Sequence, residues 1–327
     1  MQRRAITIPA VVVTAVVLTL AAPLWLVGAA AFDLVRLRRR LPTVRLLAFG
    51  WCWAWLETAG VGVAFVLWLG GQSSNQLAHF ALQRWWARRL IGTLRRTCGV
   101  SIEIDRVDAF DPGPVLVFVR HASLADALTS AYVVTSLAGL RPRFVLKREL
   151  LADPCLDVVG QRIPNFFLDR NATDSVPELD GLERLVTGLG PGECGVIFPE
   201  GTRANPTKRD RALAKIAERD PARAERLGSL QHVLPPRPSG AAAMVRGAPH
   251  ADIVIAWHVG FEGMDDFAGV LRVLGRGMQP IHFAARRIPA ADVARGESFG
   301  AWLDDQWLRV DREVGDALAA RELRRRS

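Results

Sequence analysis

The chain of 327 residues is long enough to bury a full core and to form one large domain or two smaller ones, so length alone excludes little. The formal net charge of +9 indicates an anionic partner: nucleic acid, an acidic lipid surface or a phosphorylated substrate. The four cysteines have no metal-ligand spacing and no C-x-x-C pair, which argues against a zinc site or a disulfide framework and favours free thiols in a reducing compartment.

Residues 6–32 contain no charged side chain, which is enough apolar chain to cross a hydrocarbon core at about 20 residues per crossing. The run predicts a membrane segment. A cleaved signal peptide is the alternative, because Arg3 and Arg4 precede the run and three alanines, residues 29–31, resemble a small-residue cleavage site. The apolar region of a signal peptide is only about 7 to 15 residues long, so the length favours an uncleaved anchor.

Residues 46–71 form a second apolar stretch, which Glu57 interrupts and in which Gly60 and Gly62 weaken the helical preference. A carboxylate at mid-depth is costly in lipid, so this stretch lies shallow, dips in and returns, or packs against a partner helix. If both apolar stretches crossed, the rest of the chain would lie outside.

Arginines gather between the two apolar stretches and again after the second one. This placement favours anionic lipid over nucleic acid as the partner. It also favours a second stretch that does not fully cross, or a hairpin that dips in from the cytoplasmic face, and the rest of the chain then faces the cytoplasm. The Ala- and Arg-rich composition suggests a bacterial source, so we expect the bacterial inner membrane. The arginines concerned are Arg36, Arg38, Arg39, Arg40 and Arg45, followed by Arg84, Arg88, Arg89, Arg95 and Arg96. We therefore expect a membrane anchor over residues 1–80 and a globular part over residues 81–327.

From about residue 100 short β-rich runs alternate with helical stretches, and continuous apolar strands such as "VLVFV" are typical of a sheet covered on both faces. We predict an α/β fold with a mostly parallel or mixed sheet covered by helices. The expected strands are Ser101 to Val107, Val115 to Arg120, Arg143 to Leu146, Asn165 to Leu168, Gly195 to Phe198, Asp252 to His258 and Ile281 to Ala285. The expected helices are 122–137, 176–188, 207–226 and 299–320.

The charged run 208–227 mixes acids with bases and contains no aromatic residue that could stack on a base. Alanine and leucine recur in it at helical spacing. The run predicts a solvated helix face rather than a nucleic-acid site.

The stretch "VRHASLADAL", residues 119–128, places His121 five positions before Asp126. Five residues of regular helix turn by about 140°, so the two side chains share no helix face. They can meet if His121 ends the preceding strand and Asp126 lies in the first turn of the next helix. A carboxylate on one imidazole nitrogen fixes the tautomer and prepares the other nitrogen as a general base. A structural histidine with a capping aspartate is the alternative.

Two further predicted strands also end in functional side chains. "FPEGTR", residues 198–203, follows an apolar strand, and "NFFLDR", residues 165–170, ends in Asp169 and Arg170. Ligands of open α/β sheets bind at the carboxyl ends of the strands. Two guanidinium groups near a His/Asp pair would hold a phosphate monoester in charge-assisted contacts.

The H-x-x-x-x-D, F-L-D-R and F-P-E-G-T-R motifs, in this order, resemble those of the 1-acylglycerol-3-phosphate (lysophosphatidic acid) acyltransferase family, which carries a phospholipid/glycerol acyltransferase domain. "VLKREL" (145–150), "QHVLPPRPSG" (231–240) and the tryptophan-leucine helix near the end are similar to outer blocks of the same family. The likeness covers about residues 101–316. The family usually has Asn before the histidine and a bulky residue after the aspartate, where this chain has Arg120 and Ala127.

The resemblance implies a membrane-bound enzyme without a cofactor or metal, which transfers a fatty acyl group from acyl-CoA or acyl carrier protein to the hydroxyl of a lysophospholipid in contact with membrane lipids. It implies His121 as the general base and Asp126 as the residue that orients it. It assigns the phosphate-bearing acceptor to Arg170, Glu200, Gly201, Thr202 and Arg203, and it suggests Lys147 for the oxyanion or the donor. Another lysolipid, glycerol 3-phosphate or an inactive tethered binding protein remain alternatives.

A serine hydrolase is a further alternative, because "GESFG" (296–300) matches G-x-S-x-G at Ser298. That motif needs a strand before the serine and a histidine after it, and no histidine follows His282. A cysteine enzyme is less favoured still, since Cys194 opens an apolar strand and core packing explains it.

Overall fold

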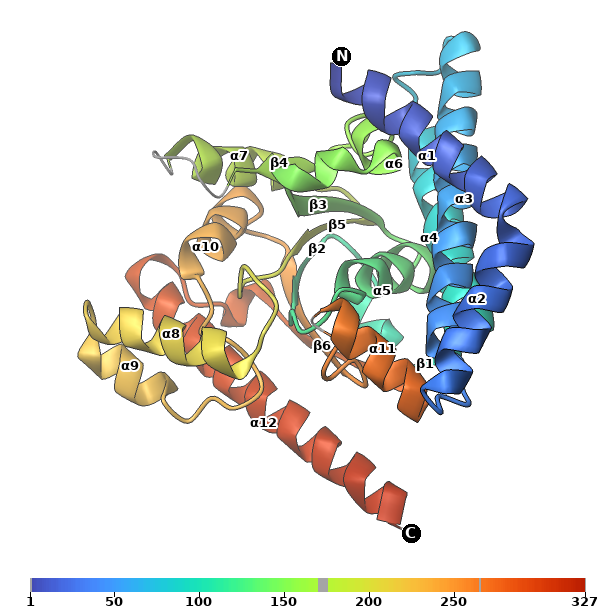
Figure 1. Cartoon of the computed structure of the whole chain (residues 1–327). Helices are drawn as coiled ribbons and strands as arrows, with labels where there is room; N and C mark the ends of the chain where they lie inside the picture. The colour runs from blue at the N-terminus through green and yellow to red at the C-terminus, as the bar shows by residue number, and fades with distance from the viewer. Residues whose placement is uncertain (1, 170–175, 265, 327) are drawn as a thin grey trace. The chain divides into compact units, whose positions relative to one another are not determined.

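The computed structural model describes residues 2–169, 176–264 and 266–326 (Figure 1). The chain forms two compact units, and each of them is built from separate stretches of sequence. The first unit contains residues 1–101, 128–172 and 267–280, and the second contains residues 102–127, 173–266 and 281–327. The predicted boundary at residue 80 stays a prediction.

The first unit begins with four helices, α1 (Gln2–Leu20), α2 (Ala22–Val35), α3 (Pro42–Leu69) and α4 (Gln76–Cys98). The unit also contains the parallel pair β3 (Arg141–Lys147) and β4 (Phe166–Leu168), with α6 (Pro154–Val158) between them. Its last element is α11 (Phe267–Arg276), which packs against α3, as α4 does along much of its length (Figure 1).

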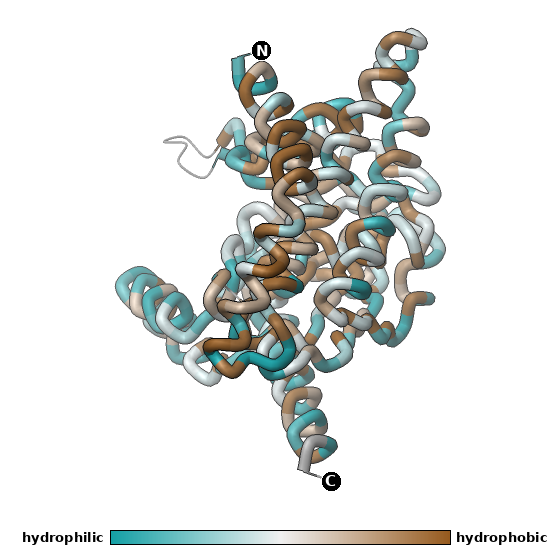
Figure 2. The backbone as a smooth tube through the Cα atoms, turned by 45° about the vertical axis from the view of Figure 1, so that its right-hand side comes forward, coloured by the Kyte–Doolittle hydropathy of each residue, from teal (hydrophilic) through white to brown (hydrophobic). Residues whose placement is uncertain are grey.

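The apolar run predicted as one segment, residues 6–32, is divided between α1 and α2. Pro23 lies in the first turn of α2, where its missing N–H costs nothing but its ring prevents α1 from continuing. Trp25 donates from its indole Nε1 to the carbonyl oxygen of Leu18 at 2.8 Å, near this break. Figure 2 shows α1 and α2 as mostly hydrophobic chain. By length and composition α1 and α3 could each cross a membrane, whereas the 14 residues of α2 are fewer than a crossing needs.

Glu57, the acidic residue inside α3, is completely buried by other parts of the first unit. Its carboxylate accepts hydrogen bonds from Trp86 Nε1 on α4 at 2.8 Å and from the backbone N–H of Cys155 on α6 at 3.0 Å. At Gly60, one turn further along α3, a Cβ atom would lie 2.7 Å from the Cys155 sulfur. The structure therefore shows this stretch packed against other helices of the first unit, as one of the three expectations had it.

The second unit is built on a mixed sheet with the strand order β1-β7-β6-β2-β5. The strands are β1 (Ile102–Asp105), β7 (Ile281–Ile288), β6 (Asp252–Val259), β2 (Val115–Val119) and β5 (Glu193–Ile197). Only β6 and β7 pair antiparallel among these strands. The predicted α/β class with a mostly parallel, mixed sheet and covering helices is confirmed.

Helices flank this sheet: α7 (Val176–Val186) contacts β5, α10 (Pro238–Gly247) contacts β2, and α12 (Phe299–Arg326) contacts β6. Every residue of the central strand β2 is buried. The predicted helix 207–226 is two helices, α8 (Pro206–Ala217) and α9 (Pro221–Leu227), because Pro221 disfavours a helical Asp220 and Asp220 caps α9. No residue of α8 is buried, which fits a solvated helix.

Candidate active site

Three parallel strands bring the candidate residues to one edge of the sheet in the second unit. Val115 of β2 pairs with Cys194 of β5 and with Asp252 of β6, so the three strands run in register. Their carboxyl ends lead directly into the segments that contain His121, Glu200 and His258. This edge is where ligands of open α/β sheets bind.

His121 contacts Asp126 as the spacing predicts: Nδ1 of His121 lies 2.8 Å from Oδ2 of Asp126. β2 ends at Val119, and α5 (Asp126–Tyr132) begins at the aspartate itself. The predicted helix start at residue 122 is wrong, because the chain from 121 to 125 turns around the carboxylate instead. Asp126 accepts hydrogen bonds from the backbone N–H of Ser123 at 2.8 Å and from the Ser123 hydroxyl.

The ring of His121 is held on one side and open on the other. It packs against Phe198 with the ring centroids 4.8 Å apart, and its side chain remains 16% exposed. Since a carboxylate can only accept, Nδ1 carries the proton in this contact and Nε2 is left with a lone pair. Among the described residues nothing hydrogen-bonds Nε2, so this nitrogen is available to take a proton.

A second histidine contacts the same aspartate. Nε2 of His258, a completely buried side chain at the end of β6, lies 3.0 Å from Oδ1 of Asp126. Burial raises the pKa of Asp126, but the charges and contacts of His258 and His121 outweigh it and hold that pKa below its ordinary value. Sequence reasoning missed His258, whose only signal was its position at the end of a predicted strand.

Glu200 is almost completely buried, and both of its oxygens bind backbone N–H groups. Oε1 accepts from His121 at 2.8 Å, and Oε2 accepts from Leu234 at 2.9 Å. Burial raises the pKa of Glu200 to about 8, although the two N–H donors and nearby Arg120 favour the charged form. Among the described residues, Glu200 makes no ion pair with an arginine. Its geometry is that of a residue that positions the His121 turn.

The rest of the "FPEGTR" loop lies against that turn. The backbone N–H of Ala204 donates to the His121 carbonyl at 2.7 Å. Nη1 of Arg203 is buried without a hydrogen-bond partner among the described residues. Gly201 has φ +72°, and a Cβ there would lie 3.2 to 3.4 Å from the Arg237 side chain. Arg237, exposed beside this loop, was not singled out by sequence reasoning.

Arg120 is buried and links two strand ends. The acyltransferase family that the sequence resembles usually has Asn at this position. Nη1 of Arg120 donates to the His258 carbonyl at 2.5 Å and its Nη2 to the His232 carbonyl at 3.0 Å. Its own backbone N–H donates to Ala256 on β6 at 2.9 Å. Arg120 therefore joins the ends of β2 and β6, and its guanidinium group points at protein carbonyls.

Residues 101–257 match the protein-family model described as Acyltransferase, a range that contains His121, Asp126 and the "FPEGTR" loop. These residues form an acyltransferase-family domain. The crystal structure of the 1-acyl-sn-glycerophosphate (LPA) acyltransferase PlsC from Thermotoga maritima is similar to this chain with a TM-score of 0.44 and 14% identity, over 81% of this chain and 95% of that one. Among curated proteins there is no match.

The three remaining predicted site residues lie in different parts of the chain. Thr202 is half-buried in the "FPEGTR" loop. Lys147 ends β3 in the first unit, whereas the site described above belongs wholly to the second unit. Arg170 lies outside the described residues. The roles predicted for all of the site residues stay predictions.

The two rival nucleophiles lie in unsuitable surroundings for their chemistry. Ser298 lies in a short 3₁₀ turn that leads into α12, and its hydroxyl donates to the Arg295 carbonyl at 2.8 Å. The strand before it, β7, ends ten residues earlier at Ile288. Cys194 is completely buried in β5, and burial raises the pKa of its thiol. These surroundings do not favour either residue as the nucleophile of an acyl-enzyme reaction.

Proposed function

We propose that the chain is a membrane-bound O-acyltransferase that transfers a fatty acyl group from acyl-CoA, or from acyl carrier protein, to the free hydroxyl of 1-acylglycerol 3-phosphate, giving phosphatidic acid. The observation that carries this proposal is the oriented imidazole: Nδ1 of His121 is fixed by the buried Asp126, and Nε2 is open. The family match supports acyl transfer as the reaction class.

In this reaction Nε2 of His121 removes the proton of the acceptor hydroxyl as that oxygen attacks the thioester carbonyl carbon. The tetrahedral intermediate then expels the donor thiolate, which receives the proton from His121 and leaves as the thiol. Asp126 stabilises the imidazolium while it carries the proton. The acyl group therefore moves directly between substrates, with no covalent enzyme intermediate.

We assign the acceptor phosphate to two arginines in and next to the "FPEGTR" loop. Nη1 of Arg203 is buried without a described partner, and Arg237 lies against the same loop. A guanidinium group binds phosphate oxygens through paired, charge-assisted N–H donors. Two such groups at the loop that contacts the His121 turn favour a phosphate-bearing alcohol over an uncharged one.

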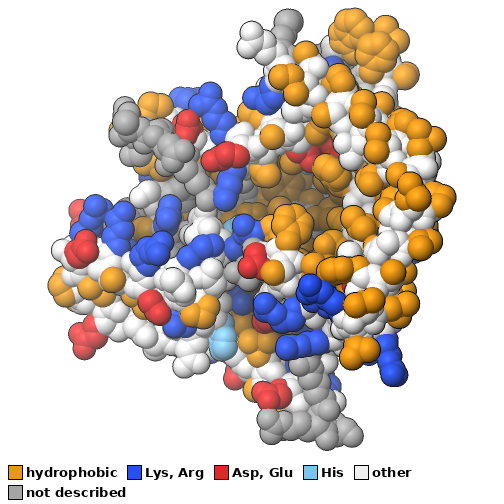
Figure 3. All heavy atoms as spheres, in the orientation of Figure 1, with side chains coloured by type: hydrophobic (Ala, Val, Ile, Leu, Met, Phe, Trp, Pro, Cys, Tyr) orange, Lys and Arg blue, Asp and Glu red, His pale blue; other side chains and the backbone are white. Residues whose placement is uncertain are grey.

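Attachment to a membrane is supported by the exposed apolar surface of the first unit. Leu20 and Leu24 are 79% and 78% exposed, and Val66 on α3 is 65% exposed. Figure 3 shows hydrophobic side chains covering much of the visible surface of these helices. α3 packs against α4, α6 and α11, which supports an α3 that does not fully cross the bilayer. Lysolipid substrates and their products stay in such a bilayer.

The proposal is tested by acyl transfer from labelled acyl-CoA to lysophosphatidic acid with purified, detergent-solubilised full-length protein. We expect wild-type protein to form labelled phosphatidic acid and His121→Ala to lose it by about 10²- to 10⁴-fold, with an unchanged melting temperature. His250→Ala, a change at an exposed histidine, serves as the matched control. Glycerol 3-phosphate and other lysophospholipids complete the panel.

Three outcomes separate the alternatives. Transfer to another acceptor in preference to lysophosphatidic acid would keep the reaction class and replace the acceptor. Equal activity of wild type and His121→Ala would contradict the general-base role. Folded wild type that transfers nothing to any acceptor would leave a tethered binding protein of the same fold.

A further inference from the structure

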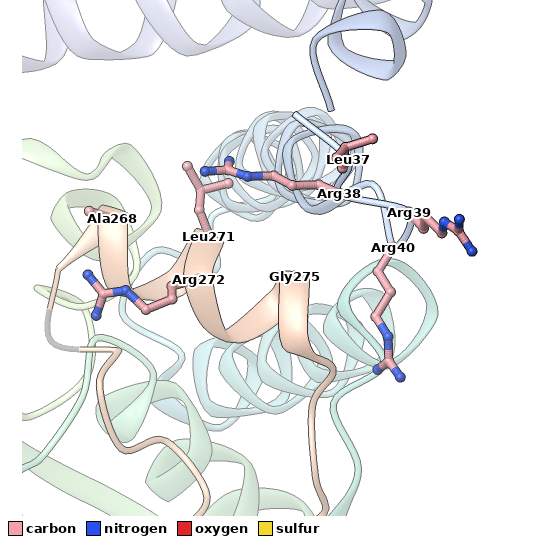
Figure 4. Close-up of a pocket in the computed structure, with 8 residues that line it drawn as sticks. All are labelled: Leu37, Arg38, Arg39, Arg40, Ala268, Leu271, Arg272 and Gly275. Carbon is pink, nitrogen blue, oxygen red and sulfur yellow. The ribbon is translucent and has the colours of Figure 1, made fainter. Parts of the chain in front are cut away.

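A pocket of about 590 Å³ opens in the first unit between the α2–α3 turn and α11 (Figure 4). Its lining comes from Leu37 to Arg40 on one side and from one face of α11 on the other. Two leucines, Leu37 and Leu271, supply apolar wall, and the remaining large side chains are arginines. No carboxylate is among the described residues that line it.

Hydrogen bonds to a buried aspartate fix the turn that carries three of these arginines. Asp33, a completely buried side chain, accepts hydrogen bonds from the Thr43 N–H at 2.8 Å and from the Thr43 hydroxyl at 2.7 Å. These contacts join the end of α2 to the start of α3 across the turn. Leu37 and Leu41 have φ of 55° and 46°, a left-handed conformation that non-glycine residues adopt only where the surroundings impose it.

The opposite wall is fixed to the same helix. Arg45 of α3 donates from Nε to the Thr97 carbonyl at 2.9 Å and from Nη1 to the Leu274 carbonyl of α11 at 3.4 Å. The Arg40 guanidinium packs so close to Gly277 that a Cβ there would clash with it. Both walls are therefore built on α3, and the pocket is formed before any ligand arrives.

Two of the lining arginines are placed to act together. In Figure 4 the side chains of Arg38 and Arg272 extend toward the same side of the pocket, whereas those of Arg39 and Arg40 point in other directions. None of these four arginines makes an ion pair with a described carboxylate. Four positive charges around one pocket repel each other, and an anion there relieves that repulsion.

The pocket lies where apolar surface meets basic surface. Val35 and Leu37, next to it in the chain, are 84% and 85% exposed. Arg36 lies over the Phe32 ring at 4.8 Å, which is how an arginine at a membrane surface keeps its charge near the headgroups and its stem in the apolar layer. Figure 3 shows Lys and Arg side chains gathered beside the hydrophobic surface, over the α2–α3 turn and α11.

We propose that this pocket binds the phosphate of an anionic membrane lipid, with Arg38 and Arg272 donating to the phosphate oxygens and the leucines contacting the glycerol and upper acyl chain. The adjoining apolar surface favours a lipid headgroup over a free phosphate compound as the source of that anion. The site does not take part in acyl transfer, and the inference goes beyond the function proposed above.

The test is calorimetric titration of full-length protein in a zwitterionic detergent with dioctanoyl phosphatidylglycerol, compared with dioctanoyl phosphatidylcholine. We expect the double variant Arg38→Gln/Arg272→Gln to weaken phosphatidylglycerol binding by at least about tenfold, because charge-assisted contacts are lost. The matched control is Arg88→Gln/Arg89→Gln, which removes the same charge from exposed positions on α4 of the same unit. Its affinity should stay within about twofold of wild type.

Further variants and competing ligands separate lipid binding at this pocket from catalysis and from folding. Binding should persist in His121→Ala and in Arg203→Gln, so a failure of the acyl-transfer proposal leaves this result intact. Equal weakening in both arginine pairs would show diffuse attraction instead of a site, and equal binding of phosphatidylcholine would remove the role of charge. Competition by inorganic phosphate or coenzyme A would replace the lipid with a soluble phosphate compound. If the double variant unfolds, Arg272→Gln alone decides the same question.

Discussion

Nε2 of His258 lies 3.0 Å from Oδ1 of Asp126, the carboxylate oxygen that His121 does not contact. The buried aspartate therefore lies between two imidazole rings, which come from the ends of two neighbouring parallel strands. Burial raises the pKa of Asp126, but the charges and contacts of the two histidines outweigh it and hold that pKa below its ordinary value. An aspartate that stays ionised keeps the proton on Nδ1 of His121 and leaves Nε2 as the base.

Asp126→Asn should reduce kcat by about 10²- to 10⁴-fold, because the amide NH₂ can donate to Nδ1 and favour the tautomer whose Nε2 carries the proton. The measurement is the initial rate of acyl transfer at saturating substrates, with the melting temperature recorded in parallel. Asp105→Asn is the control, since Asp105 pairs with His282 at 3.3 Å at a partly exposed position. A rate within threefold of wild type in Asp126→Asn would remove the orienting role.

His258→Phe should move the acid limb of the kcat profile to higher pH and lower kcat by about tenfold with little change in KM. His258 favours the ionised form of Asp126, so removing it raises the pKa of that carboxyl, and protonation then interrupts the pair at higher pH. The check is kcat and KM from about pH 5 to 9. His282→Phe is the matched histidine control, and an acid limb that stays in place in His258→Phe would assign His258 to packing alone.

Glu200→Gln should lower both stability and kcat, because the glutamine NH₂ cannot accept the N–H that one oxygen of Glu200 now accepts. An unsatisfied buried N–H costs about 1 to 3 kcal/mol, and the affected donors belong to His121 and Leu234. Chemical unfolding and kcat are measured on the same preparations. Glu183→Gln breaks only an exposed pair with Arg246 and should change stability by less than about 1 kcal/mol. Matching behaviour of the two variants would contradict the positioning role.

Wild-type stability should fall, relative to Glu200→Gln, as the pH rises from about 4.5 toward about 8. The pKa of Glu200 is raised on folding to about 8, so in this window the folded state holds a proton that the unfolded state has released. The difference in bound protons makes the free energy of unfolding decrease with rising pH, and the decrease ends above about pH 8. Melting temperatures of both proteins at six pH values test this. Parallel curves would show that Glu200 has an ordinary pKa.

Gly60→Val should destabilise the first unit by about 1 to 3 kcal/mol, since the new Cβ would lie 2.7 Å from the Cys155 sulfur and α3 would have to move away from α6. Gly62→Val is the control on the same helix, because a Cβ at Gly62 has no atom within 4 Å. Thermal unfolding in detergent measures both. A Gly60→Val protein as stable as Gly62→Val would show that the packing of α3 on α6 is loose.

All seven predicted strands are present, because each is a short apolar run with β-branched residues between turn signals. The helices outside the predicted set include α10 and α11. α10 contains Ala and Gly, begins at a proline and follows two more, and α11 is only ten residues long between two glycine-containing loops. In both segments the local preference for helix is weak. Packing against α7 and α12 stabilises α10, and packing against α3 stabilises α11.

The sequence by itself determined the α/β class, the apolar N-terminal helices and the contact between His121 and Asp126, because apolar periodicity and a five-residue spacing are local properties of the chain. Only the tertiary structure decided that His258 shares Asp126, that Glu200 holds the His121 turn, and that Arg38 and Arg272 line one pocket. The residues of these three pairs are 79 to 234 positions apart along the chain. The pairing of the strands and helices that contain them depends on burial summed over the whole unit. The spacing of residues along the chain does not show how much surface the whole unit buries.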